Sequence, residues 1–505
     1  MKRLALSLGL GLGTALAAAE FDPWFGDGMV LQRDQPIRVA GRARPHGHVT
    51  LRLGDQTAQA QADAAGRWQQ AFAARAANPQ PTSLTAQEAD QPDAVIRDIL
   101  IGDVWLCAGQ SNMEFPLSRD AEAKQVLPQT TLPLVRIRNH SFAGQYRFAA
   151  PLDAATVARM TTQGFYAGRW EPCTPRSAAP TTAVGYYFAQ RVAKETGVPI
   201  GLVNYAVGGA PIEAFISREA LAADDTFRKK VSGNWLENES IEGSFVRLRG
   251  RQHVGAAKDA PADECGPNHG FKPGFAWAAG PGQITSFPLK GVLWYQGESN
   301  AIRREDIAEY GALMRLLVAD WRRRWQQPAL PFYWVQLPSI DEPAREFWPE
   351  FRAVQDQLAR EIPATGMAVA LDVGTPKDVH PRNKRPVGER LAGLALRDLY
   401  GRRDVIAEGP VAVSARQSGE TLRVRFRSAE GLTIGGGATP LIEIRSAHAD
   451  QFQAVQGARV EGEEIVVAVT GRVAEVRYAW HMNAAAALRN GAGLPAGPFA
   501  LKISE

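Results

Sequence analysis

The sequence has little cysteine, and the three that it contains among 505 residues exclude a fold built on disulfide bonds. Cys107 lies inside an apolar run, which predicts a buried thiol. Cys173 and Cys265 lie in loop-like sequence and could pair with each other in an oxidising compartment. The spacing alone leaves that pairing open.

Long hydrophobic runs are also scarce, and the main one is at the N-terminus. Residues 1–19 combine Lys2 and Arg3 with an apolar stretch and a closing run of three alanines. This pattern predicts a secretory signal peptide that is cleaved before Glu20. The stretch is too short and too rich in glycine to span a membrane. We therefore expect an exported protein, periplasmic or secreted, that is not attached to a membrane.

The sequence also lacks a strong excess of charge and the common cofactor motifs. Its formal charge is +4 with no long basic run, which argues against a nucleic-acid partner. H-E-x-x-H, paired C-x-x-C, Walker and G-x-G-x-x-G motifs are missing, so we expect no metal and no cofactor. The G-x-S-x-G elbow of α/β-hydrolases is missing as well, because GQSNM ends in Met113.

The patterns that are present divide the chain into regions. Residues 20–96 alternate apolar and polar side chains, which predicts a β-rich region, and the same alternation returns over 405–505. Between them, near-continuous apolar runs are typical of strands buried in a parallel sheet. These runs are 103–109, 200–207, 290–296, 331–337 and 366–373. Helical periodicity appears over 182–196, 304–326, 345–361 and 384–400. Residues 97–404 therefore predict a doubly wound α/β domain, with 218–285 as a long and irregular insertion.

Ser111 is the first candidate for chemistry. It lies in GDVWLCAGQSNMEFPL, residues 102–117, just after an apolar run and an Ala-Gly pair that leaves room for a sharp turn. Serine at the carboxyl end of a parallel strand stands where α/β folds keep their chemistry. The alternative is a serine that only caps the following helix. As a nucleophile, Ser111 would need a base.

His380, one of eight histidines, is the best placed candidate for that base. It follows the last apolar run, so it should lie at the same edge of the sheet as Ser111. Pro381 favours an extended backbone, in which residues two apart face the same way, so Asp378 could orient the imidazole. A backbone carbonyl or Asp372 could do the same. The alternative is a loop histidine beside a surface aspartate.

Two further strand ends offer hydrogen-bond donors. GLVNYAVGGAPIEAF turns at Gly208-Gly209, and GVLWYQGESN presents several polar groups after a buried run. Such turns can supply the N–H groups that stabilise a developing oxyanion. Within the second turn, Glu298 is expected to be a buried carboxylate that orients loops. Three aromatic side chains on the strands are expected to keep the acyl pocket small: Trp105, Trp294 and Tyr295.

These blocks, together with DVHPRNKRPVGERLA, resemble the sialate O-acetylesterase family of SGNH-type hydrolases. MVLQRDQPIRVAG near the start and RYAW near the end are similar to the flanking β regions of that family. The resemblance implies a flavodoxin-like, three-layer α/β/α esterase domain that removes acetyl groups from sugar hydroxyls without a metal. Its relatives include enzymes of acetylated plant polysaccharides such as xyloglucan and xylan, so the resemblance leaves the sugar open.

The resemblance also implies roles for individual residues. Ser111 corresponds to the nucleophile and one oxyanion donor, and His380 to the base. Gly209, in preference to Gly208, and Gln296 correspond to the other oxyanion donors. We expect three further residues to support the site: Gln110, Glu298 and Asn300. Asn300 is also the alternative to Gln296 as the side-chain oxyanion donor.

The acid departs from the pattern of the wider superfamily. The usual acid lies three residues before the histidine, where this sequence has Lys377, whereas Asp378 lies two before it. A different class of function also stays open, namely a carbohydrate-binding β-sandwich protein with a vestigial esterase core. Intact Ser111 and His380 count against that alternative.

Overall fold

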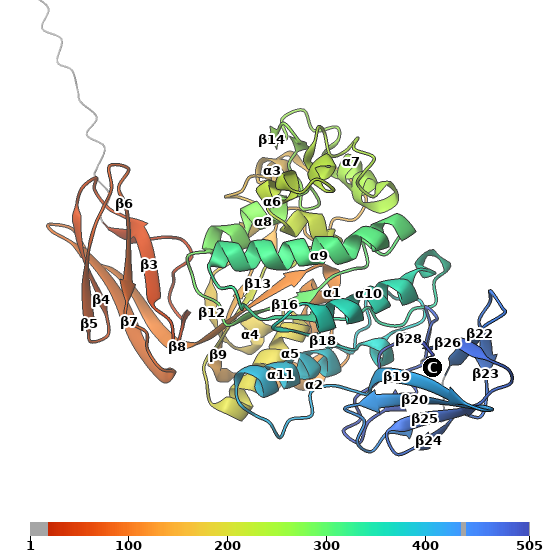
Figure 1. The fold of residues 1–505 in the computed structure, drawn as a ribbon. Helices are drawn as coiled ribbons and strands as arrows, with labels where there is room; N and C mark the ends of the chain where they lie inside the picture. The colour runs from red at the N-terminus through yellow and green to blue at the C-terminus, as the bar shows by residue number, and fades with distance from the viewer. Residues whose placement is uncertain (1–18, 436–440, 504–505) are drawn as a thin grey trace, which may run out of the picture.

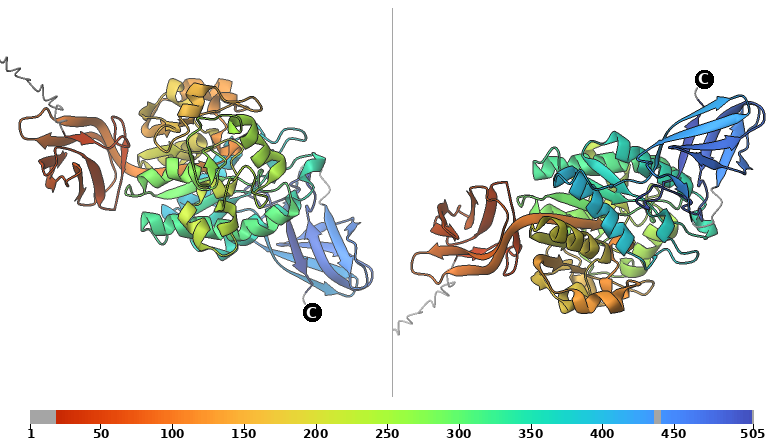
Figure 2. Two further views of the ribbon diagram at one scale, coloured as in Figure 1. Left: turned by 90° about the horizontal axis from the view of Figure 1, so that it is seen from above. Right: turned by 90° about the horizontal axis from the view of Figure 1, so that it is seen from below.

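The computed structural model describes residues 19–435 and 441–503. An α/β centre lies between two β regions, one formed by the start of the chain and one by its end (Figure 1). Two further views place these β regions at opposite ends of the centre (Figure 2). Residues 1–18, which hold nearly all of the expected signal peptide, lie outside the described part. Within that part, no helix has the length and apolar character needed to cross a membrane.

The central sheet is parallel apart from one edge strand. Its order is β12-β9-β13-β8-β16-β17-β18, and β12 runs antiparallel to β9. The strands are β8 (Ala94–Gly109), β9 (Leu132–Asn139), β12 (Trp170–Cys173), β13 (Ile200–Asn204), β16 (Gly291–Tyr295), β17 (Phe332–Val335) and β18 (Thr365–Ala368). β8 lies between β13 and β16, and the direction in which the chain adds strands reverses there. Such a reversal is where α/β sheets bind ligands.

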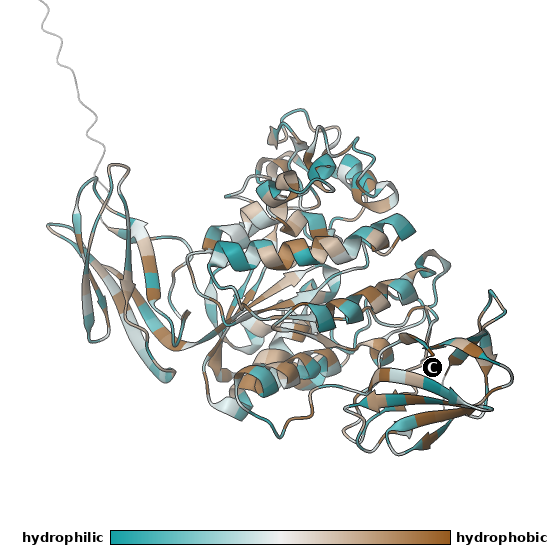
Figure 3. Cartoon of the chain, viewed as in Figure 1, coloured by the Kyte–Doolittle hydropathy of each residue, from teal (hydrophilic) through white to brown (hydrophobic). Residues whose placement is uncertain are grey.

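Helices cover both faces of this sheet. α5 (Ala183–Thr196) and α11 (Arg385–Leu399) share one apolar cluster with β13, and α9 (Arg304–Trp325) and α10 (Trp348–Glu361) share another with the opposite face. Hydrophobic residues concentrate on the strands of the sheet, whereas the helices that cover it carry both hydrophobic and hydrophilic residues (Figure 3). This arrangement confirms the predicted three-layer α/β/α architecture.

β9 is a parallel strand that the sequence did not reveal. Two arginines, Arg136 and Arg138, interrupt its apolar pattern, yet both are buried. The Arg138 guanidinium lies 4.8 Å from the Trp24 ring and donates to the carbonyls of Pro23 and Trp24. A partner more than 100 residues away in sequence therefore allows charged residues in this strand.

The N-terminal β region is continuous with the centre through one strand. β8 pairs with β7 (Asn78–Glu88) near its start and with β13 and β16 near its end. The other strands of the region are β1 (Glu20–Phe21), β2 (Val30–Gln32), β3 (Ile37–Arg42), β4 (His48–Leu53), β5 (Gln56–Gln61) and β6 (Arg67–Phe72). The strand that leads to Ser111 thus begins in this β region.

The C-terminal β region contains two four-stranded sheets. They are formed by β19 (Val411–Ser418), β20 (Thr421–Arg427), β25 (Glu464–Ala468) and β24 (Arg459–Glu461), and by β23 (Gln453–Val455), β22 (Ile442–Ser446), β26 (Val473–Tyr478) and β28 (Phe499–Lys502). Arg352 of α10 joins the region to the centre, because its buried guanidinium donates to the carbonyls of His481 and Met482.

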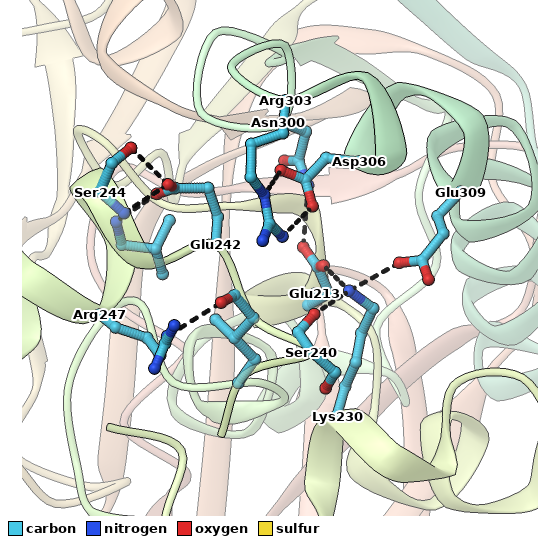
Figure 4. A network of polar contacts seen from close by, with 12 residues as sticks. Glu213, Lys230, Ser240, Glu242, Ser244, Arg247, Asn300, Arg303, Asp306 and Glu309 are labelled. Atoms are coloured by element: carbon cyan, nitrogen blue, oxygen red, sulfur yellow. Dashed lines mark hydrogen bonds and ion pairs between the residues drawn. The ribbon is translucent and has the colours of Figure 1, made fainter. Parts of the chain in front are cut away.

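The insertion 218–285 is more ordered than its sequence suggests. It contains α6 (Arg218–Ala223), α7 (Leu248–Val254) and α8 (Phe275–Ala279). Lys230 anchors it, since the buried ammonium lies 2.9 Å from Glu213 and 2.8 Å from Glu309 of α9 (Figure 4). Burial of these charges is tolerated because each has a partner.

The three cysteines are all buried free thiols. Cys173 donates to the carbonyl of Thr130, and Cys265 donates to that of Val231. The structure therefore does not contain the disulfide that the sequence left open, while Cys107 is buried as predicted.

Candidate active site

Ser111 stands on a sharp turn directly after β8. Gly109 has φ +125°, and a Cβ there would lie 2.2 Å from the carbonyl oxygen of Tyr295, so only glycine fits. Ser111 then begins the short helix α1 (Ser111–Glu114), with Gln110 before it in an extended conformation. The turn brings the Ser111 hydroxyl to the edge of the sheet, where it is partly exposed.

His380 reaches this hydroxyl from the loop after β18. Its Nε2 lies 2.8 Å from Ser111 Oγ, across 269 residues of sequence. Burial and the nearby Lys384 lower the pKa of His380, and Asp378 opposes them. The imidazole is therefore neutral at neutral pH and can accept a proton from Ser111.

Asp378 is a loose neighbour of this histidine. Its Oδ1 lies 3.6 Å from His380 Nδ1, which is longer than a hydrogen bond, and its side chain is 56% exposed. The same oxygen accepts a 2.8 Å hydrogen bond from the His380 backbone N–H. Asp372, the other carboxylate considered, is bound to Arg390 and Arg489 instead.

The Gly208-Gly209 turn follows β13 beside Ser111. The Gly208 N–H donates to the carboxyl of Glu114, and Gly209 has φ +80°. In the described part of the chain, the N–H groups of Ser111 and Gly209 have no hydrogen-bond acceptor. These two N–H groups are therefore available to a ligand at this edge of the sheet.

The expected donor Gln296 lies differently. Its Nε2 donates to Asn300 Oδ1 at 2.7 Å and to the Ala210 carbonyl at 3.4 Å. Asn300 Oδ1 also accepts a hydrogen bond from the Ile212 N–H, and Asn300 Nδ2 donates to Glu213. Neither amide lines the cavity at Ser111, so both connect loops beneath it.

Gln110 does support the turn after β16. Its Oε1 accepts hydrogen bonds from the N–H groups of Gly297, at 3.4 Å, and Ser299, at 3.2 Å. The Ser299 hydroxyl donates to the Gly209 carbonyl at 2.9 Å. These bonds join the loops that follow β8, β13 and β16 into one unit.

A buried polar cluster holds the histidine loop, and the sequence reasoning expected its Glu298 but missed its other two members, Asn112 and Lys384. Asn112 donates through Nδ2 to Glu298 Oε1 and, at 2.9 Å, to the carbonyl of Val379, the residue before His380. Lys384 donates to Asn112 Oδ1 and lies over the Phe115 ring. Burial lowers the pKa of Lys384 to about 7 and raises that of Glu298. Asn112 and Lys384 both stand in motif blocks, but only the fold shows that they meet.

A cavity of about 250 Å³ opens above Ser111 and His380. Six phenylalanines from separate parts of the chain line it: Phe115, Phe142, Phe148, Phe165, Phe245 and Phe271. The insertion also contributes His253 and His269, whose rings share a 2.9 Å contact between Nδ1 and Nε2.

Trp105, Trp294 and Tyr295 do not line the cavity, contrary to expectation. All three are fully buried among the layers of the α/β centre. Trp105, for example, packs against Phe188 of α5 and Tyr333 of β17. The prediction was wrong because side chains within a doubly covered sheet point to its helices and not to its edge.

The described residues contain no group of three or more histidine, cysteine, aspartate or glutamate side chains that could hold a metal ion. A metal-free reaction stays a prediction.

Comparison with known proteins agrees with this site. A family model for carbohydrate esterases, the sialic acid-specific acetylesterases, matches residues 101–234 and 280–397. These ranges include all four loops that surround Ser111.

Individual relatives extend the similarity over most of the chain. The sialate O-acetylesterase of Rattus norvegicus is 27% identical over 456 residues, covering 81% of this chain and 79% of the relative. That of Homo sapiens is 26% identical over 442 residues, covering 81% and 77%. The solved structure of a carbohydrate acetylesterase from Xanthomonas citri is 30% identical, with a TM-score of 0.76, and the match covers 96% of this chain and 99% of that one. The chain therefore belongs to the carbohydrate esterase family of the sialic acid-specific acetylesterases.

Proposed function

We propose that this esterase hydrolyses acetyl esters on sugar hydroxyls, with Ser111 as the nucleophile and His380 as its base. The observation that carries the proposal is the 2.8 Å contact between Ser111 Oγ and His380 Nε2 on the wall of the cavity. A serine within hydrogen-bond reach of a neutral histidine is the pair that acyl transfer requires.

The reaction follows from these positions. His380 takes the proton of Ser111 as its oxygen bonds to the acetyl carbon, and the carbonyl oxygen becomes an oxyanion. The N–H groups of Ser111 and Gly209 stabilise that charge. The C–O bond to the sugar then breaks, and His380 returns the proton to the sugar oxygen. Water repeats the sequence on the acetyl-serine and releases acetate.

Asp378 assists this histidine only weakly in our proposal. Its carboxylate raises the pKa of His380, but its exposure to water and the 3.6 Å separation weaken the interaction. The carbonyl of Val379, fixed by Asn112, and the backbone N–H of His380, bound to Asp378, hold the loop in place. We therefore treat Ser111 and His380 as the essential pair.

Substitution of Ser111 by alanine tests the serine mechanism. Acetate release from an aryl acetate should fall by on the order of 10³-fold or more, since no other group replaces the nucleophile. Ser118→Ala, at an exposed position one helix further along, is the matched control. A Ser111→Ala variant that keeps more than a tenth of the wild-type kcat would reject the mechanism.

The sugar and the compartment belong to the same proposal. Three relatives are named as sialate or carbohydrate acetylesterases, which supports an O-acetylated sugar as the substrate. The resemblance leaves two kinds open, O-acetylated sialosides and plant oligosaccharides such as those of xyloglucan. Acetate release from a panel of both kinds separates them. We propose export through the N-terminal signal, and N-terminal sequencing of the mature protein, expected to begin at Glu20, checks it.

A further inference from the structure

The loop that follows β10 (Ser141–Phe142) forms the outer edge of the cavity. It carries Tyr146 and Phe148, which are 51% and 68% exposed and line the opening. Tyr146 has φ +61°, a conformation that a bulky side chain rarely adopts and that is often kept for function. Exposed aromatic rings beside an ester site suit the apolar face of a pyranose ring.

A side-chain hydrogen bond connects this loop to the floor of the site. Gln145 Nε2 donates to Glu114 Oε1 at 2.8 Å. Glu114 is 6% exposed and stands three residues after Ser111, in the same short helix. The outer edge and the nucleophile helix therefore meet at one buried carboxyl.

The same carboxyl also holds the turn with the free Gly209 N–H. It accepts the N–H of Gly208, and a Cβ on Gly208 would lie 2.5 Å from Glu114 Oε2. The carboxyl thus fills the space that a side chain at position 208 would need. A shift of the Glu114 carboxyl would move the Gly208 N–H or break its hydrogen bond. Either change would displace the neighbouring N–H of Gly209.

We propose that Glu114 is a positioning residue that couples the sugar-facing loop to the oxyanion turn. Tyr146 and Phe148 contact the sugar that carries the acetyl group or its neighbour, and this contact fixes Gln145. Gln145 fixes Glu114, and Glu114 fixes Gly208 and the Gly209 N–H. The sugar then contributes to kcat as well as to binding, as expected when remote contacts are used to position the reacting groups. The inference rests on the proposed function.

The loop residue Gln145 gives the sharpest test, because it touches neither the ester nor the nucleophile in this account. Gln145→Ala should lower kcat on an aryl acetate about fivefold, although that substrate has no sugar to lose. Gln190→Ala, which removes a comparable single hydrogen bond within α5, is the control and should leave kcat unchanged. An unchanged aryl-acetate kcat in Gln145→Ala would overturn the coupling.

A double-mutant comparison separates coupling from simple damage to the fold. Glu114→Ala should lower kcat about tenfold, and adding Gln145→Ala should lower it no further. Additive losses would overturn the proposal. Gln145→Glu, which sets two carboxyl groups against each other, should lower kcat, and the exchanged pair Glu114→Gln with Gln145→Glu should restore it at least in part. A merely structural role predicts no such rescue, and its absence counts against the coupling.

The experiments distinguish a failure of this inference from a failure of the proposed function. A wild-type chain with no turnover of an aryl acetate would overturn the serine esterase proposal and this coupling with it. An active wild type that loses activity in Ser111→Ala, but shows additive effects at positions 114 and 145, would overturn the coupling alone.

Discussion

The two walls of the cavity differ in origin. The inner wall, formed by Ser111, Gly209, Glu298 and His380, consists of loops that directly follow strands of the central sheet. The outer wall is formed by residues 142–148, which follow β9 through the short strand β10, and by residues 245–271 of the insertion, in the long segment between β13 and β16. The inner wall holds the polar groups of the reaction, and the outer wall holds most of the aromatic side chains. This difference indicates that the reacting groups and the sugar-facing rings come from separate parts of the chain, which meet at the hydrogen bond from Gln145 to Glu114.

If the walls are separate in this way, inner-wall substitutions should affect every ester alike. His380→Ala should lower kcat by on the order of 10³-fold on both an aryl acetate and an acetylated oligosaccharide, because Ser111 loses its base. His48→Ala, at an exposed position of β4 in the N-terminal region, is the control. A loss confined to the oligosaccharide would mean that His380 serves sugar binding instead.

Substitutions in the buried cluster of Asn112, Glu298 and Lys384, which lies behind the inner wall, should have the second largest effect. Asn112→Leu leaves Glu298 and Lys384 buried without their shared partner, which should lower stability by about 3–5 kcal/mol. It also frees the Val379 carbonyl, so the folded enzyme should lose roughly tenfold or more in kcat. Denaturant unfolding and aryl-acetate kinetics measure the two effects, with Gln129→Leu on the surface as the control. Wild-type stability would show that the cluster does not hold the histidine loop.

Asp378 should have a smaller effect, about tenfold or less, because its carboxylate is exposed and 3.6 Å from the imidazole. The pH profile shows more clearly in which direction Asp378 shifts the pKa of His380. Activity requires neutral His380, and Asp378 raises the pKa of that histidine. Asp378→Asn should therefore lower the pKa and move the acid limb of kcat/KM to lower pH. A 10²-fold loss would restore the full triad that the sequence suggested, with Asp378 orienting the imidazole.

The exposed rings of the outer wall should give the smallest effect on simple esters. Phe148→Ala, at a side chain that is 68% exposed, should change aryl-acetate kcat/KM by less than twofold. It should lower kcat/KM on an acetylated oligosaccharide by about fivefold, because a ring that the sugar can contact is lost. Ile406→Ala, at another exposed apolar position that lies outside the cavity, should change neither. Equal losses on both substrates would break the distinction between the walls.

The same difference explains what could be predicted from the sequence. Ser111 and His380 were found because each follows a continuous apolar strand, and the ends of parallel strands meet at one edge. The outer wall has no such periodicity. Phe245 and Phe271 reach the cavity through short helices and turns anchored by Lys230, whose partners Glu213 and Glu309 lie elsewhere in the sequence.

The directions and partners of individual side chains were the other features that could not be predicted from the sequence. Gln296 was assigned as an oxyanion donor by resemblance, but its amide is bound to Asn300 four residues later. β9 was missed because Arg138 is buried against Trp24, a contact that only the assembled N-terminal region provides. In each case the deciding partner lies in a turn or in a distant segment that periodicity does not describe.

The central claim is that Ser111 is the nucleophile, and covalent labelling tests it most directly. The enzyme would be treated with an aryl phosphonate ester, which forms a stable bond with an activated serine, and the labelled peptide would be identified by mass spectrometry. Our account predicts one equivalent of label on Ser111, loss of acetate release in parallel, and no label in His380→Ala. Complete inactivation with the label on another residue, or acetate release that continues after Ser111 is fully labelled, would contradict it.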